Sequence, residues 1–137
     1  MDWSAEYSVH IDEIDAQHKV LFEAITELEH SINHPTQQQR WSNIHYALVK
    51  LQDFVRIHFA VEEALLRILK YPAMAEHLAQ HRDFEAYLHE IERRSLTHEV
   101  GEEEIVAYLR SWLEGHIKHE DNRYSRYFTS LHLTPAA

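Results

Sequence analysis

The stretch IDEIDAQHKVLFEAITELEHSI, residues 11–32, carries the pattern that decides the fold. Its inward positions recur at alternating steps of three and four, which is the spacing of one face of an α-helix. These positions are Ile11, Ile14, His18, Leu21, Ile25, Leu28 and Ile32. One of them is a histidine, where a bundle helix ordinarily places Leu or Ile. The stretch therefore predicts a bundle helix with one polar group on its buried face.

Three further segments repeat this spacing. The second seam is Trp41, Ile44, Leu48, Leu51, Val55, His58, Glu62, Leu65 and Leu69. The third is Met74, His77, His81, Phe84, Leu88, Ile91 and Ser95. The fourth is Ile105, Leu109, Trp112 and His116, continued by Asp121, Tyr124, Phe128 and Leu131. Four helices with short connections predict an all-α, antiparallel up-down-up-down four-helix bundle.

We expect this bundle to be a single domain over residues 1–137, since the chain has the length of one domain. A short N-terminal arm over residues 1–10 precedes helices over about residues 12–33, 37–70, 72–96 and 102–131. His34-Pro35 ends the first helix, and Thr36 with Gln39 forms a capping-box signature for the second. Pro72 suits the first turn of the third helix.

Composition narrows the class of protein. With 2 Gly, 3 Pro and no Cys, the chain has few turn residues and can form neither a disulfide framework nor a cysteine-based metal site. A net charge of −10 without a basic block argues against nucleic acid and anionic membranes as partners. No apolar run approaches the roughly 18 residues of a membrane span, and the N-terminus lacks the features of a signal peptide. We expect a soluble, cytoplasmic protein.

The fourth seam contains one irregular step. From His116 to Asp121 is five residues, whereas the seam requires three or four. A π-helical bulge would absorb the extra residue, and such bulges are frequent at functional sites. Fraying or a break of the helix would also explain the step, so both alternatives stay open at this point.

Polar residues of metal-ligand type occupy every seam. They are His18, His58, Glu62, His77, His81, His116 and Asp121. In an antiparallel bundle, those of the second and third seams lie about ten residues from their shared turn, and those of the third and fourth about twenty from theirs. Three levels therefore coincide. His18 fits this level less well, because it lies several residues closer to the first turn than the second-seam pair does.

These buried groups require partners. An unsatisfied buried polar side chain costs about 1–3 kcal/mol, so seven would rival the roughly 5–15 kcal/mol stability of a whole domain. A self-satisfied hydrogen-bond network is one solution, but convergence from four helices favours a metal site. Five imidazoles and two carboxylates exceed the ligands of one tetrahedral zinc and suit two bridged ions. Imidazole suits iron, copper, nickel and zinc alike, so the ligands alone do not select the metal.

Together these residues form the motifs of a known family. The motifs are IDAQHK (14–19), HFAVE (58–62), HLAQH (77–81) and HIKHED (116–121). In this order they resemble the hemerythrins, specifically the single-domain bacterial members. The resemblance implies two non-haem irons bridged by Glu62, Asp121 and an oxo or hydroxo group. It places His77, His81 and His116 on one iron and His18 and His58 on the other, which keeps an open position.

The same resemblance implies a function. In the family O2 binds at the open position, and the residues here that match its pocket are Leu21, Phe59, Trp112 and Ile117. Each of these four is also explained as ordinary core. We expect reversible O2 binding for storage, transport or delivery, without enzymatic activity. An O2 or redox sensor that acts through a separate partner protein is the alternative, followed by a di-iron oxidase or peroxidase.

Three further expectations concern residues beside the motifs. Trp3 and Tyr7 of the N-terminal arm are assigned to packing. Glu63 is expected to face partly away from the site, as a solvated carboxylate or as an outer partner of a ligand. The histidines off the seams, including His119, are expected at the surface.

Overall fold

The part of the chain that the structure describes folds into a bundle of four helical rods. A computed structural model describes residues 2–33, 35–96 and 101–131. Its α-helices are α1 (Asp12–Ser31), α2 (Gln37–Ile68), α3 (Met74–Ser95), α4 (Glu102–Gly115) and α5 (Asn122–Ser130). A 3-10 turn, η1 (Ala5–Tyr7), lies in the arm, and a π-helical segment, η2 (His116–Asp121), joins α4 to α5. The predicted all-α four-helix bundle is confirmed.

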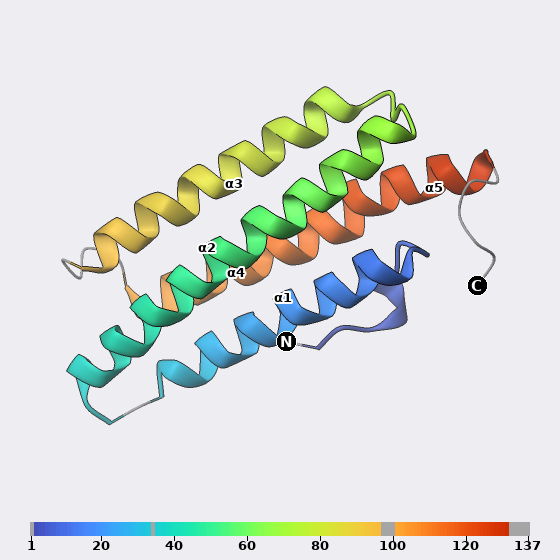
Figure 1. Ribbon diagram of the computed structural model, residues 1–137. Coiled ribbons are helices and arrows are strands. Elements are labelled where there is room, and N and C mark those ends of the chain that lie inside the picture. Colours follow the sequence, from blue (N-terminus) through green and yellow to red (C-terminus); the bar gives the residue numbers. More distant parts are fainter. Residues whose placement is uncertain (1, 34, 97–100, 132–137) are drawn as a thin grey trace.

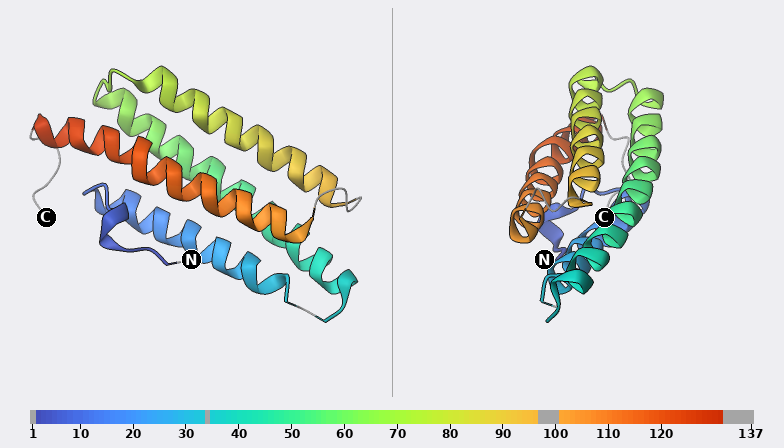
Figure 2. Two further views of the ribbon diagram at one scale, coloured as in Figure 1. Left: turned by 180° about the vertical axis from the view of Figure 1, so that it is seen from behind. Right: turned by 90° about the vertical axis from the view of Figure 1, so that its left-hand side faces the viewer.

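The fourth rod consists of α4, η2 and α5 in one continuous run (Figure 1). Successive rods are antiparallel, and the views from behind and from the side show all four lying together (Figure 2). α1 packs against α2 and α4, and α2 packs against α3. Between α3 and α4, stacked aromatic pairs fill the space, with ring centroids 3.8 Å apart for Phe84 and Trp112 and 3.6 Å apart for Tyr87 and Tyr108.

The start of α2 shows half of the predicted capping box. The Thr36 side chain accepts a hydrogen bond from the Gln39 backbone N–H at 3.4 Å. The Gln39 side chain donates to Asn43 Oδ1 at 2.7 Å instead of returning to the cap. The predicted helix stop at His34 lies outside the described residues.

The turn between α2 and α3 differs from the expectation for Pro72. Lys70 has a φ of 55°, which is the left-handed conformation, and the Tyr71 N–H donates to the Leu66 carbonyl at 3.0 Å. This is a common way for an α-helix to end. The chain makes a further turn before α3 begins at Met74. Pro72 therefore lies in the connection and not in the first helical turn.

Two apolar clusters divide the interior of the bundle. The larger cluster includes Leu21 of α1, Phe59 of α2 and Ile117 of η2. The smaller consists of Val9, Ile14, Leu66, Tyr71, Tyr124 and Phe128. Along α1, α2 and the fourth rod, the polar seam residues stand between members of the two clusters. Apolar side chains thus exclude water from this polar layer on both sides.

The N-terminal arm is tied to α1 and to the core. Asp15 accepts hydrogen bonds from the Ser8 hydroxyl at 2.6 Å and from the Val9 N–H at 2.9 Å. Tyr7 is buried, with its ring centroid 4.9 Å from that of Phe22. The packing role predicted for Tyr7 is confirmed. Among the described residues no helix is both long enough and apolar enough to cross a bilayer.

Candidate metal centre

The structure brings together all the polar seam residues that the sequence singled out. Their potential ligand atoms form two overlapping groups that share Glu62, and every member is buried. We call His77, His81 and His116 the three-histidine group. His18 and His58 form the two-histidine group. The four rods each contribute at least one of these side chains, so the site depends on the whole bundle.

The irregular step in the fourth seam is absorbed by the π-helix η2 (His116–Asp121). Five residues along an α-helix turn through about 500°, so these two side chains would point in different directions. In the π-helix both face the bundle interior, and His116 Nε2 lies 3.1 Å from Asp121 Oδ1. The π-helical alternative is therefore confirmed, and the alternative of fraying or a break is excluded.

His18 reaches the level of the other candidate ligands because α1 and α2 are staggered. The first turns of α2 extend beyond the end of α1 (Figure 1), so equal distances in sequence from the connection are not equal heights in the bundle. The ring centroids of His18 and His58 are 4.8 Å apart. The misfit in the sequence count thus reflects the offset helix and not a misplaced residue.

Glu62 divides its two oxygens between the two groups. Its Oε1 lies 2.9 Å from His77 Nε2 and 3.0 Å from His81 Nε2. Its Oε2 lies 3.7 Å from His18 Nε2 and 3.8 Å from His58 Nε2. The phenol of Tyr124 donates a hydrogen bond to Oε2 at 3.0 Å. The carboxylate is therefore oriented to bridge two ions.

Asp121 shows the same division. Its Oδ1 lies 3.1 Å from Nε2 of both His77 and His116, and its Oδ2 lies 3.1 Å from His18 Nε2. Each of the two carboxylates thus turns one oxygen toward each histidine group. A dinuclear centre with two bridging carboxylates requires this arrangement.

The hydrogen bonds inside the cluster are incomplete. Among the described residues, neither oxygen of Asp121 and neither ring nitrogen of His18 has a hydrogen-bond partner of acceptable geometry, although they lie close to each other. A self-satisfied network would pair these atoms, because an unpartnered buried polar atom is costly. The seven side chains instead fit a pair of cations at the centre.

Charges within the cluster shift the ionisation of the imidazoles. Burial disfavours the charged form of His18 and His77, but the carboxylates of Asp121 and Glu62 outweigh it and raise the pKa of His18 to about 9 and of His77 to about 10. Burial lowers the pKa of His58 to about 4. Without bound ions, protons on His18 and His77 thus balance the two carboxylates, and arriving cations would displace them.

The carboxylates are held in the ionised form. Burial raises the pKa of Glu62, but the adjacent His18, His77 and His81 outweigh it and hold the pKa well below its usual range. The pKa of Asp121 is likewise lowered, because His116 and His18 outweigh burial and the repulsion of Glu62. Burial raises the pKa of Tyr124 well above its ordinary value, so this phenol stays a donor.

Three of the imidazoles have a hydrogen-bond partner on the ring nitrogen that faces away from the cluster, which we call an outer partner. The sequence analysis did not predict two of these partners, Gln17 and Gln80, and named the third, Glu63, with two alternative roles. His58 Nδ1 lies 2.6 Å from Gln17 Oε1, and His116 Nδ1 lies 2.9 Å from Gln80 Oε1. His81 Nδ1 lies 2.8 Å from Glu63 Oε2. Glu63 is buried, so of its two expected roles the outer partner is correct and the solvated carboxylate is wrong.

A sequence signal for these partners exists. Gln17 precedes His18, Glu63 follows Glu62, and Gln80 precedes His81. Each partner is thus the sequence neighbour of one candidate ligand and contacts the imidazole of another on the next rod. An exposed position was expected for His119 and is confirmed.

The residues predicted for an O2 pocket lie beside the cluster. Leu21, Phe59 and Ile117 are buried in the larger apolar cluster, and Trp112 is half-buried against it. Phe59 stacks on His81 with centroids 3.7 Å apart, and Trp112 stacks on His116 at 4.5 Å. Their role as a pocket stays a prediction.

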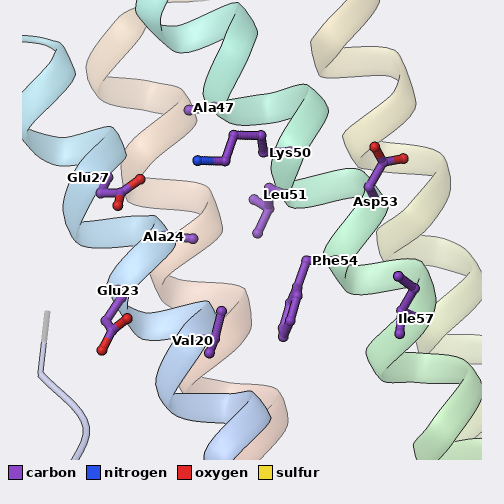
Figure 3. Close-up of a pocket in the computed structure, with 10 residues that line it drawn as sticks. All are labelled: Val20, Glu23, Ala24, Glu27, Ala47, Lys50, Leu51, Asp53, Phe54 and Ile57. Atoms are coloured by element: carbon purple, nitrogen blue, oxygen red, sulfur yellow. The ribbon is translucent and has the colours of Figure 1, made fainter.

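A separate groove of about 390 Å³ opens between α1 and α2 (Figure 3). Its apolar wall includes Val20, Phe54 and Ile57, and its rim carries Glu23 and Lys50. None of the four predicted pocket residues lines it. This outer groove is therefore not the predicted pocket.

Fold and site together define a four-helix-bundle protein with a buried cluster of metal-ligand side chains. A family model described as "Hemerythrin HHE cation binding domain" matches residues 9–128. The chain belongs to the hemerythrin family, and its bacterial type is supported by bacteriohemerythrins among its relatives.

Relatives match over most of their length. A bacteriohemerythrin of Clostridium acetobutylicum is 23% identical over 89% of this chain and 96% of its own. A hemerythrin of Siphonosoma cumanense is 30% identical over 89% and 88%. A solved structure described as wild-type hemerythrin superimposes with a TM-score of 0.81 at 26% identity, covering 92% of this chain and 95% of that one.

Proposed function

We propose that this protein binds O2 reversibly at a non-haem di-iron centre, for oxygen storage, transport or delivery. The three-histidine group holds one iron and the two-histidine group holds the other. Glu62 and Asp121 bridge the pair, together with an oxo or hydroxo group. The relatives named hemerythrin and bacteriohemerythrin support this assignment, as does the description of the family as cation-binding.

The unequal sharing of ligands is the observation that carries the proposal. Both carboxylates turn one oxygen to each group, so the groups differ only by one imidazole. If the two ions have the same coordination number, the ion held by two histidines would have one more free coordination position than the ion held by three. Two ferrous ions bound there would supply two electrons to O2, and the free position would give O2 access to them.

Residues around the site orient the imidazoles and exclude water from the polar layer. The Phe59 and Trp112 rings lie against His81 and His116 and limit their rotation. The two apolar clusters border the polar layer on both sides and exclude bulk water from it. A dry site protects a bound reactive species from hydrolysis and from further reduction, which a reversible carrier requires.

The test begins with metal analysis of the purified protein and continues with an O2 cycle. Anaerobically reduced protein is titrated with O2, returned to argon and titrated again, while absorbance and peroxide are followed. Uptake of one O2 per pair of irons, with full return and no peroxide over repeated cycles, is expected. Irreversible oxidation, or steady turnover with added reductant, would overturn the carrier and favour an oxidase. Tight, slowly reversed binding would favour a sensor.

A further inference from the structure

The outer partners of the ligand histidines differ in charge. Gln17 and Gln80 offer neutral amide oxygens to His58 and His116. Glu63 offers a carboxylate oxygen to His81, 2.8 Å from Nδ1. Of the three outer contacts, only the one at the three-histidine group's His81 therefore brings a negative charge to the back of a ligand.

Glu63 is itself part of a chain of charges that reaches the surface. The same Oε2 that faces His81 contacts the guanidinium of Arg82. Arg82 also lies 3.1 Å from Glu85, and its side chain is 54% exposed. A buried carboxylate and a solvent-facing cation thus stand in line behind His81. Their positions follow from the packing of α2 against α3, which brings Glu62-Glu63 opposite His81-Arg82.

We propose that Glu63 sets the reduction potential of the iron in the three-histidine group through His81, and that Arg82 is its counter-charge. The inference rests on the proposed di-iron centre. Glu63 is a positioning residue, since it touches the ligand and not the metal. Accepting the Nδ1 proton of His81 makes the opposite ring nitrogen more basic. A negative charge in a poorly screened interior also favours the ferric over the ferrous ion.

The two members of the pair have opposite expected effects. Glu63→Gln keeps an oxygen that accepts from His81 but removes the charge, so the reduction potential rises. Arg82→Gln leaves the carboxylate uncompensated, so the potential falls. We expect each to change the ferrous-to-ferric ratio at a given potential by roughly tenfold, a factor comparable with the smaller effects that outer partners have on metal affinity. The potential is measured by spectroelectrochemical titration, with mediators supplying the electrons.

Two further variants separate this role from general effects of charge. Arg93→Gln removes the same charge from the same helix, eleven residues and about 16 Å further along, where Arg93 is paired with Glu90 at 2.6 Å. Its effect on the potential should be much smaller than that of Arg82→Gln. Gln80→Glu places a carboxylate behind His116 and should lower the potential, as a second outer charge.

A merely structural role for Glu63 would not give effects of opposite sign. Potentials that move in the same direction in Glu63→Gln and Arg82→Gln, or that stay at the Arg93→Gln value, would overturn the proposal. If Glu63→Gln fails to retain iron, Arg82→Gln and Gln80→Glu still decide it. The 15N signals of His81 in the zinc-loaded protein provide an independent readout, since loss of the charged acceptor shifts Nδ1.

The O2 cycle distinguishes this inference from the proposed function. Opposite shifts in a protein that oxidises irreversibly would uphold the role of Glu63 and reject the carrier. A normal O2 cycle with unshifted potentials would uphold the carrier and reject the role of Glu63.

Discussion

The imidazoles of the three-histidine group are restrained by more contacts than those of the two-histidine group. In the three-histidine group, Phe59 stacks on His81 and Trp112 on His116, and each of these imidazoles has a hydrogen-bond partner behind it. In the two-histidine group, His58 is held by Gln17, whereas neither nitrogen of His18 has a hydrogen-bond partner in the described part of the chain. The imidazoles of the three-histidine group are thus more restrained, and those of the two-histidine group have fewer constraints where a small ligand is proposed to bind.

The largest expected effect comes from deleting one ligand in each half. His77→Ala removes one imidazole of the three-histidine group, which faces both carboxylates, so the iron content should fall clearly below two per chain. His18→Ala leaves the three histidines and both carboxylates intact, and should keep about one iron per chain. Metal analysis of both variants checks this. Full iron content in His77→Ala would contradict the ligand assignment.

Metal binding should depend steeply on pH. His18 and His77 have pKa values raised to about 9 and about 10, so both are protonated at neutral pH and must lose these protons to act as ligands. Between pH 6 and 8 the apparent affinity for Fe2+ should therefore fall by up to roughly a hundredfold for each unit that the pH decreases. Anaerobic titration of the metal-free protein measures the affinity, and an indicator dye measures proton release. An affinity independent of pH would contradict the charge balance described above.

The raised pKa values also have a consequence for the metal-free protein. A group with a raised pKa stabilises the fold below its unfolded value of 6.5, and this contribution is lost as the pH rises through the folded value. The contribution of His18 and His77 to the free energy of unfolding should therefore decline from pH 6.5 to about 10. Urea unfolding at several pH values measures it, and His18→Gln should flatten the dependence.

The contribution of packing beside the three-histidine group to the free energy of unfolding should be measurable in the metal-free protein. Phe59 is fully buried and stacked on His81, so Phe59→Ala should lower the free energy of unfolding by about 3–5 kcal/mol. Tyr46→Ala on the same helix removes a ring that is 66% exposed and should change it by less than about 0.5 kcal/mol. Urea unfolding of the metal-free variants gives both values. Equal losses would contradict the asymmetry in packing between buried and exposed rings.

The smallest expected effect concerns the neutral outer partners. Gln17→Leu and Gln80→Leu each remove one oxygen that orients an imidazole, and should weaken metal binding by roughly tenfold. Gln17→Leu should affect the ion of the two-histidine group and Gln80→Leu the other. Stepwise titration with Co2+, whose spectrum reports each site, resolves them. Equal effects of both variants on both ions would show that the outer contacts are not specific to one half.

Much of the site could be predicted because helical periodicity specifies direction. Residues such as His58 and Glu62, four apart on a seam, must share the buried face of a helix. The polarity of the seam residues separated the candidate ligands from the apolar core. The irregular step from His116 to Asp121 predicted a disturbance but not its form, because an extra residue is compatible with both a π-helix and a break. Backbone hydrogen bonding decided between them.

The outer contacts could not be predicted in the same way. Gln17, Gln80 and Glu63 each pair with an imidazole on a different rod, so the pairing depends on the stagger and rotation of two helices. The same stagger explains why a residue count placed His18 at the wrong height. The number of residues from a turn gives the position of a residue along its own helix, but not its level relative to residues of the neighbouring helix.

The sequence by itself determined the four helices, the buried polar layer and the identity of its seven members, because these depend on periodicity and polarity along one chain. Only the tertiary structure decided which carboxylate oxygen faces which imidazole, which side chain stands behind each ligand, and where Arg82 meets Glu63. These depend on the distances and rotations between helices, which side-chain packing sets and which no pattern along a single helix encodes.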